Sequence, residues 1–269
     1  MDRIKDRFDA LAARGDMGLI PYLTVGFPTV EDTLSLIPAL EEGGADVIEL
    51  GVPFSDPIAD GPTIQRSSFH ALTQGVTPAA CLDVCGRLRG AGVSVPFVLM
   101  GYYNSILSYG LERFAGDAAQ AGVDGAIVVD LPFEEAGPLR NAFDPLGIHI
   151  IPLLTPTSTD TRIEMNCEGA GGFVYCVSLT GVTGARDELP PGIPDMTRRV
   201  RCHTELPLAV GFGVSQRRHV EALSSCAQAA VVGSALVDLV DRTPGERRAE
   251  EAKEFVAGLK GAVPTQGRR

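Results

Sequence analysis

The 269-residue sequence has only three lysines, Lys5, Lys253 and Lys260, and all of them lie in the helical segments at the two ends of the chain. No predicted strand therefore ends in the reactive amine that a Schiff-base aldolase needs. The sequence also lacks the G-x-S-x-G pattern of a hydrolase nucleophile elbow. These two absences argue against both kinds of covalent catalysis.

Histidine is scarce as well. The four histidines show no H-x-H or H-x-x-x-H spacing, and the six cysteines contain no C-x-x-C pair. We therefore expect no metal site. The cysteines are interpreted as small buried hydrophobic residues in a reducing compartment.

Long apolar segments are missing too. No run reaches the roughly 18 residues that a membrane span requires, and the charged start of the chain does not resemble a secretion signal. The net charge of -11 disfavours nucleic acids and anionic membranes as partners. The sequence therefore predicts a soluble, cytoplasmic protein.

Short apolar runs alternate with helical patterns along the whole chain. The eight runs expected to form strands cover residues 19–25, 46–50, 97–101, 125–130, 148–154, 172–178, 208–211 and 229–233. Strands that are apolar on both faces and alternate with helices pair in parallel. Eight such units predict a single-domain (β/α)₈ TIM barrel over residues 1–269, with an extra N-terminal helix at 1–14 and an extra short helix after the eighth strand. A doubly wound sheet is the alternative, but no G-x-G-x-x-G follows the first strand.

The most informative stretch is 48–61, which reads IELGVPFSDPIADG. Glu49 lies in a strand expected to be buried on both faces, where a carboxylate is costly unless it has a partner or a task. A loop rich in turn formers follows and carries Asp60. Two carboxylates in different environments suit general acid–base catalysis, because burial can separate their pKa values. Asp46 and Asp124 precede their strands and are interpreted as structural residues at the opposite end of the barrel.

Glycines follow two consecutive strands near the C-terminus, as Gly211 and Gly213 after the seventh and Gly233 with Ser234 after the eighth. In TIM barrels these two loops and the N-terminus of a short extra helix often bind phosphate through backbone N–H groups. The segments 53–60 and 179–191 are expected to be mobile active-site loops. Together these features predict carboxylate acid–base chemistry on a phosphorylated substrate, without a cofactor or a metal.

The same motifs resemble those of the tryptophan synthase α subunit family, and the stretch 48–61 carries the most specific likeness. Further matching segments follow in the family's order: Pro21-Tyr22, Gly26-Phe27-Pro28, Met100-Gly101-Tyr102-Tyr103-Asn104, Asp130-Leu131-Pro132, Gly181-Val182-Thr183-Gly184, Gly211-Phe212-Gly213 and Gly233-Ser234. The resemblance covers nearly the whole chain. It implies retro-aldol cleavage of indole-3-glycerol phosphate to indole and D-glyceraldehyde 3-phosphate, as a step of L-tryptophan biosynthesis.

The resemblance also implies roles for individual residues. Glu49 would be the main proton donor and acceptor, Asp60 would hold the indole N–H, and Tyr175 would be a supporting hydroxyl. The substrate pocket would be formed by Tyr22, Met100, Ile127, Val129, Leu153, Thr183 and Phe212. The phosphate cradle would be formed by Gly184, Gly213, Gly233 and Ser234.

A partner is implied by the same resemblance, namely a β subunit that contains pyridoxal phosphate and joins the chain in an α₂β₂ complex. The residues expected to contact it lie on loops of the active face: Pro53, Asp56, Asn104, Ser108, Pro132 and Glu135. Two positions depart from the expected pattern, Ser105 in place of proline and Leu179-Thr180 in the lid. The alternatives are a free-standing lyase, a weakly catalytic activator of a β subunit, and a phosphosugar isomerase on the same barrel.

Overall fold

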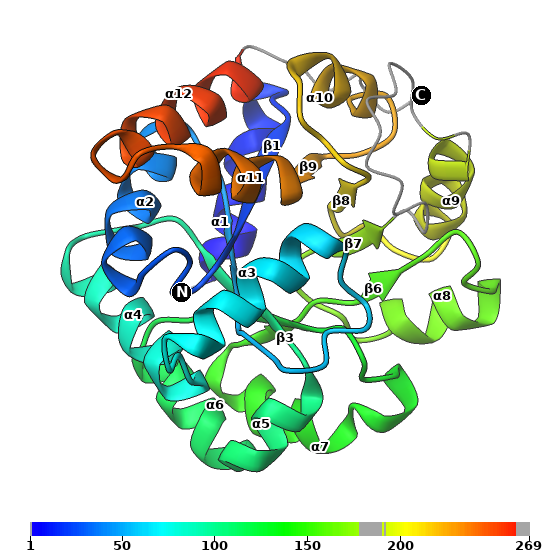
Figure 1. The fold of residues 1–269 in the computed structure, drawn as a ribbon. Coiled ribbons are helices and arrows are strands. Elements are labelled where there is room, and N and C mark those ends of the chain that lie inside the picture. The colour runs from blue at the N-terminus through cyan, green and yellow to red at the C-terminus, as the bar shows by residue number, and fades with distance from the viewer. Residues whose placement is uncertain (1, 178–189, 191, 262–269) are drawn as a thin grey trace.

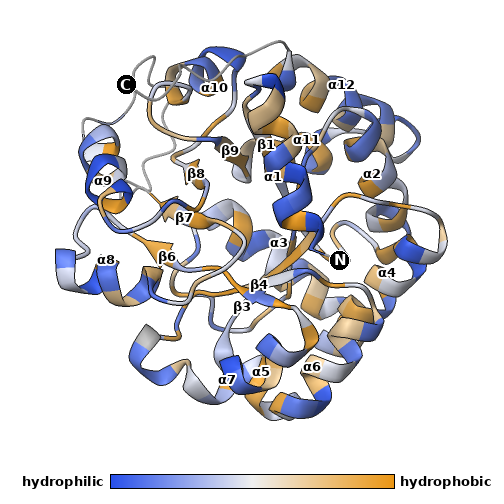
Figure 2. Cartoon of the chain, turned by 180° about the vertical axis from the view of Figure 1, so that it is seen from behind, coloured by the Kyte–Doolittle hydropathy of each residue, from blue (hydrophilic) through white to orange (hydrophobic). Residues whose placement is uncertain are grey.

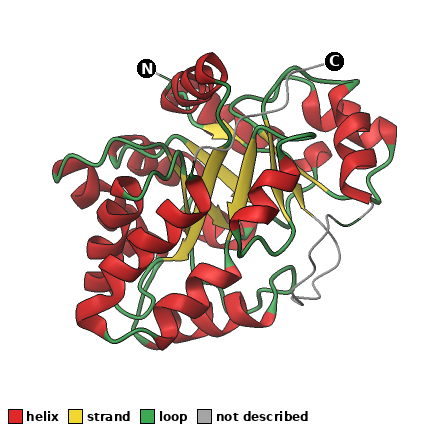
Figure 3. Ribbon diagram, turned by 90° about the horizontal axis from the view of Figure 1, so that it is seen from above, coloured by secondary structure: helices red, strands yellow, loops and turns green. Residues whose placement is uncertain are grey.

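Parallel strands form the wall of a barrel and helices surround it (Figure 1, Figure 3). The computed structural model describes residues 2–177, 190 and 192–261. The strands are β1 (Gly18–Thr24), β2 (Ile48–Gly51), β3 (Phe97–Gly101), β4 (Gly125–Val128), β5 (His149–Ile150), β6 (Leu153–Leu154), β7 (Val174–Val177), β8 (Leu208–Gly211) and β9 (Ala229–Val232). They follow the order β5-β4-β3-β2-β1-β9-β8-β7-β6, and every pairing is parallel.

The two outermost strands of this order, β5 and β6, are halves of one extended segment, and this segment closes the barrel. Its first half pairs with β4, where the Ile151 N–H donates to the Ala126 carbonyl at 2.9 Å. Its second half pairs with β7, where the Pro152 carbonyl accepts from the Tyr175 N–H at 2.9 Å. Proline has no N–H to donate, so the ladder changes partner there. The predicted eight-stranded barrel is confirmed, with its fifth strand in two short pieces.

Helices fill the connections between the strands. They are α1 (Arg3–Arg14), α2 (Val30–Glu42), α3 (Pro62–Thr73), α4 (Pro78–Gly90), α5 (Tyr103–Tyr109), α6 (Leu111–Gln120), α7 (Gly137–Phe143), α8 (Asp160–Cys167), α9 (Gly192–Arg201), α10 (Arg217–Leu223), α11 (Ser234–Arg242) and α12 (Arg248–Lys260), with 3₁₀ turns at Phe133–Glu135, Asp144–Leu146 and Gly245–Arg247. The expected extra helices are α1 and α11. Helix α5 was not predicted; Gly110, at φ 98°, separates it from α6. None of the described helices combines the length and apolar character needed to cross a membrane.

The alternation of side chains along each strand creates two cores. The inward residues form one cluster together with Ile4, Phe8 and Leu11 of α1. Helix α1 therefore closes the N-terminal end of the barrel, and Figure 2 shows it in front of the hydrophobic strands from that side. The outward residues pack beneath the other helices in a second, larger cluster.

Two buried aspartates hold this closed end together. Asp124 accepts hydrogen bonds at 2.8 Å from the guanidinium groups of Arg3 and Arg89 and from the Phe97 N–H. Asp46 accepts from the Leu19 N–H at 2.8 Å and from the Lys260 ammonium group. These carboxylates join α1, α4 and α12 to the starts of the strands, so both have the structural role expected from their positions.

We expect Asp124→Ala to lower the free energy of unfolding by about 3 kcal/mol, because it leaves buried donors without an acceptor. Urea denaturation followed by circular dichroism measures the loss. The matched control is Asp83→Ala, which removes an exposed carboxylate 3.7 Å from Arg87 and should cost less than about 0.5 kcal/mol. Equal losses for the two variants would contradict the structural role of Asp124.

Candidate active site

Glu49 projects from β2 into the barrel and is only 2% exposed. Its neighbours in register are Tyr22 on β1 and Val98 on β3. Among the residues that the structure describes, its Oε2 atom is buried and has no hydrogen-bond partner. A buried polar atom without a partner is rare and costly, so it points to a task outside the fold's own hydrogen bonding.

Asp60 lies on the loop between β2 and α3 and is tied down by Tyr102. The Tyr102 hydroxyl donates to Asp60 Oδ2 at 3.1 Å and accepts from the Ala59 N–H at 3.1 Å. The Tyr102 ring also stacks on Phe54 of the same loop, with centroids 4.8 Å apart. Tyr102 is not among the residues predicted to form the site. Its position directly after the third strand, where active-site residues of a barrel lie, is the sequence feature that could have indicated it.

Burial separates the pKa values of the two carboxyl groups. Desolvation, and then the charge of Asp60, raise the pKa of Glu49 from its ordinary 4.5 to about 8. Desolvation raises the pKa of Asp60 to about 6, and the hydrogen bond from Tyr102 opposes this rise. Near pH 7, Glu49 therefore holds a proton while Asp60 is ionised. One group is a loaded proton donor and the other a fixed negative charge.

Two tyrosine hydroxyls occupy space that glycines leave open. A Cβ atom at Gly211 would lie 2.6 Å from the Tyr175 hydroxyl, and one at Gly51 would lie 2.1 Å from the Tyr22 hydroxyl. Burial, followed by the charge of Glu49, keeps the pKa of Tyr175 well above its ordinary value, so the phenol stays protonated. Gly51 and Gly211 therefore make room for side chains of the site. For Gly211 this differs from the prediction, which placed it only in a phosphate-binding loop.

The predicted pocket residues fall into three groups. Ile127 belongs to the inward cluster with Tyr175, and Met100, Val129 and Leu153 are half-buried against it. Tyr22 and Phe212 group with the other cluster, although the Tyr22 hydroxyl points toward Gly51. Thr183 lies outside the described residues.

The predicted phosphate residues lie at the ends of adjacent strands. Gly213 follows β8 and has a positive φ of 92°. Gly233 follows β9 and precedes α11, which begins at Ser234. The first N–H groups of a helix have no acceptor within the helix and can bind an anion. Gly184 lies outside the described residues. Within 2–177, 190 and 192–261, no cluster of side chains could hold a metal ion.

The residues predicted to contact a partner are mostly at the surface. Asp56, Asn104, Ser108 and Glu135 are exposed and Pro132 is half-buried, whereas Pro53 is buried by its own chain. The sequence analysis missed two apolar residues on the same elements, Ile58, which is 87% exposed, and Leu107, which is 53% exposed.

A TIM barrel with two buried carboxyl groups of different pKa on one face has a geometry that suits an enzyme using acid–base catalysis. The comparison with known families is more specific. The family model described as "Tryptophan synthase alpha chain" matches residues 8–263, and the chain belongs to this family.

Individual relatives cover the chain almost completely. It is 51% identical over 262 residues to the tryptophan synthase alpha chain of Roseiflexus castenholzii, covering 97% of this chain and 100% of the relative. It is 45% identical to "Tryptophan synthase" of Saccharomyces cerevisiae, covering 96% of this chain but 37% of that longer one. Among solved structures, the alpha chain of Legionella pneumophila superposes with a TM-score of 0.88 at 33% identity, covering 97% and 96% of the two chains.

We expect Glu49→Gln to be more stable than the wild type at alkaline pH. The pKa of Glu49 is 4.5 when unperturbed and about 8 in the fold. Between these two pH values, the folded state therefore holds more protons than the unfolded state, and the free energy of unfolding falls as the pH rises. Glutamine stays neutral, so the variant has no such loss. Melting temperatures of both proteins at pH 5 and pH 9 measure the effect.

The stability advantage of Glu49→Gln should be large at pH 9 and shrink toward pH 5. Glu112→Gln, on the exposed face of α6, is the control and should show no such pH dependence. A Glu49→Gln advantage that grows as the pH falls would refute the raised pKa.

Proposed function

We propose that the chain is a lyase that cleaves indole-3-glycerol phosphate to indole and D-glyceraldehyde 3-phosphate in L-tryptophan biosynthesis. Membership of the tryptophan synthase alpha chain family supports this reaction. The observation that carries the proposal is the pair of carboxyl groups, because the reaction needs a proton donor at one atom and a negative charge near another. Glu49 and Asp60 have the pKa values, about 8 and about 6, that suit these two tasks.

In the proposed reaction, Glu49 donates its proton to the indole carbon that bears the glycerol chain. The ring nitrogen then carries positive charge, which the carboxylate of Asp60 stabilises through the N–H. Glu49, now ionised, takes the proton of the adjacent glycerol hydroxyl as the carbon–carbon bond breaks. The bonding electrons return to the ring, the hydroxyl carbon becomes the aldehyde, and Glu49 is protonated again. Every proton and electron pair is accounted for without a cofactor.

The remaining predicted residues position the substrate in this proposal. Met100, Ile127, Val129 and Leu153 would surround the indole ring. The N–H groups near Gly213, Gly233 and Ser234 would bind the phosphate, and the helix dipole of α11 favours a negative charge there. Tyr175, protonated and buried beside Gly211, would support the reacting carbon chain by a hydrogen bond.

We propose further that the chain works in the cytoplasm with a β subunit that contains pyridoxal phosphate, in an α₂β₂ complex. The yeast relative named tryptophan synthase is a much longer chain that contains a segment similar to this one. The exposed residues Asp56, Asn104 and Ser108, together with the apolar Ile58 and Leu107, provide a surface on the active face for such a partner.

The direct test is indole release from indole-3-glycerol phosphate by the wild type and Glu49→Gln, each with and without a β subunit. Glutamine keeps the shape of Glu49, but its amide cannot act as a general acid or base. We therefore expect a loss of at least about 10²-fold in kcat. Glu42→Gln, an exposed residue of α2, is the control and should keep full activity. Faster indole release in the presence of the β subunit would support the complex. The same rate with and without the β subunit would indicate a free-standing lyase. A wild type that releases no indole under either condition would overturn the proposal.

The two pKa values also predict a bell-shaped pH profile for kcat/KM. Activity should rise as Asp60 ionises near pH 6 and fall as Glu49 loses its proton near pH 8. Asp60→Asn should abolish the acidic limb and lower overall activity. It should also move the alkaline limb to lower pH, because the charge that raises the pKa of Glu49 is gone. An unchanged alkaline limb in this variant would show that the two carboxyl groups are not coupled.

A further inference from the structure

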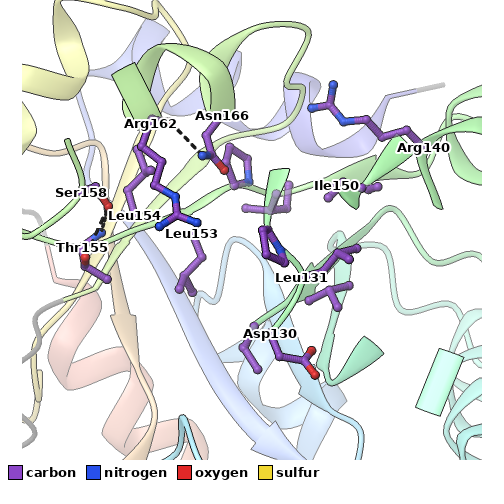
Figure 4. Close-up of a pocket in the computed structure, with 16 residues that line it drawn as sticks. Asp130, Leu131, Arg140, Ile150, Leu153, Leu154, Thr155, Ser158, Arg162 and Asn166 are labelled. Carbon is purple, nitrogen blue, oxygen red and sulfur yellow. Dashed lines mark hydrogen bonds between the residues drawn. The ribbon is translucent and has the colours of Figure 1, made fainter. Parts of the chain in front are cut away.

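A cavity of about 270 Å³ opens on the outer wall of the barrel between α7 and α8 (Figure 4). Its floor is apolar and includes Val128, Ile150 and Leu154, which belong to the outward core. Glu49, Asp60 and Tyr175 do not line it. Val129 and Leu153 of the predicted substrate pocket do line it, so the cavity adjoins that pocket through the wall of the barrel without including its carboxyl groups.

The shortness of the two flanking helices accounts for the opening. Helices α7 and α8 have seven and eight residues, whereas α2 and α4 have thirteen each. At about 1.5 Å per residue, the shorter pair spans only about 10 to 12 Å. They leave the outer side of the interrupted fifth strand uncovered, and Ile150 remains half-buried there.

Two of the three charged residues that line the cavity are cationic, although the whole chain has a net charge of -11. Arg140 of α7 and Arg162 of α8 line it, with a single carboxylate, Asp130. That carboxylate is already engaged, since its Oδ1 accepts from the Tyr103 N–H at 2.7 Å. A negative charge entering the cavity would therefore meet two guanidinium groups and one carboxylate, whose charge this hydrogen bond does not neutralise.

Arg162 is the natural anchor. Figure 4 shows its side chain extending from α8 over Leu153 and Leu154. Arg162 is exposed, and its hydrogen bonds to other described residues involve its backbone N–H and carbonyl rather than its guanidinium group. Asn166 lies one turn further along the same face of α8 and donates to the Arg162 carbonyl at 2.8 Å. The amide of Asn166 is thereby held at the backbone of Arg162, and both residues line the cavity.

We propose that this cavity is a second ligand site, and that it binds a small carboxylate with a flat apolar body. Guanidinium groups bind carboxylates through two parallel hydrogen bonds, which gives the site its preference for this anion. The apolar floor takes the ring, in the usual combination of an apolar pocket with a few polar groups. The proposal does not depend on the reaction at the other site.

The test is a titration of the full chain with 2-naphthoate, followed by the isoleucine δ1-methyl signals in NMR spectra. Ile150 faces the cavity, whereas Ile127 belongs to the inward cluster of the barrel. We expect the largest shift at Ile150. The neutral analogue 2-naphthamide should bind about tenfold more weakly, because it lacks the charge that strengthens the hydrogen bonds.

Substitution at the anchor separates this site from nonspecific binding. Arg162→Gln should weaken 2-naphthoate about tenfold and leave 2-naphthamide unchanged, while Arg162→Lys should keep part of the affinity. Arg87→Gln removes an exposed arginine of α4 and is the matched control, with no expected effect. The proposal is overturned if Ile150 does not shift, if Ile127 shifts more than Ile150, or if Arg162→Gln binds 2-naphthoate as tightly as the wild type.

Discussion

Glu49 brings a carboxyl group into the apolar interior of a parallel barrel, where its Oε2 atom finds no hydrogen-bond partner among the described residues. The burial of apolar side chains in the two cores offsets the free energy that this desolvation costs. The same burial keeps the group protonated near neutral pH, with a pKa of about 8. The lost solvation of Glu49 is thus also the source of its capacity to donate a proton. Asp60 strengthens the effect by adding a like charge, and Tyr102 holds Asp60 in place.

The two ends of the barrel treat their carboxylates in opposite ways. At the closed end, Asp124 and Asp46 accept several hydrogen bonds each, and their charges are compensated by arginine and lysine. At the open end, the buried Oε2 atom of Glu49 has no hydrogen-bond partner among the described residues. A satisfied carboxylate stabilises the fold, whereas an unsatisfied one stays reactive. This division separates stability from chemistry along the barrel axis.

Much of the architecture could be predicted from the sequence because strands buried on both faces have a simple signature. The eight apolar runs, the extra helices and the burial of Glu49 follow from such local patterns. Helix α5 was missed because it begins directly after the third strand and its N-cap, Tyr102, is not a residue that signals a helix start. The contact between Tyr102 and Asp60 was also missed, because it joins residues 42 positions apart through a loop. A loop without periodicity gives no register from which such a pair can be inferred. The roles of the predicted site residues remain predictions.

A single proline, Pro152, interrupts the fifth strand and affects both faces of the barrel wall. Pro152 cannot donate to a ladder, so the strand passes from β4 to β7 at that point and the barrel closes with little regular pairing. On the inner side, Leu153 still reaches the cluster that contains Tyr175. On the outer side, two short helices leave Ile150 half-buried at the cavity that Arg162 lines. The two shortest strands that the structure describes therefore lie between the candidate active site and the proposed second site. A segment with so few ladder pairs is expected to open locally more readily than the longer strands.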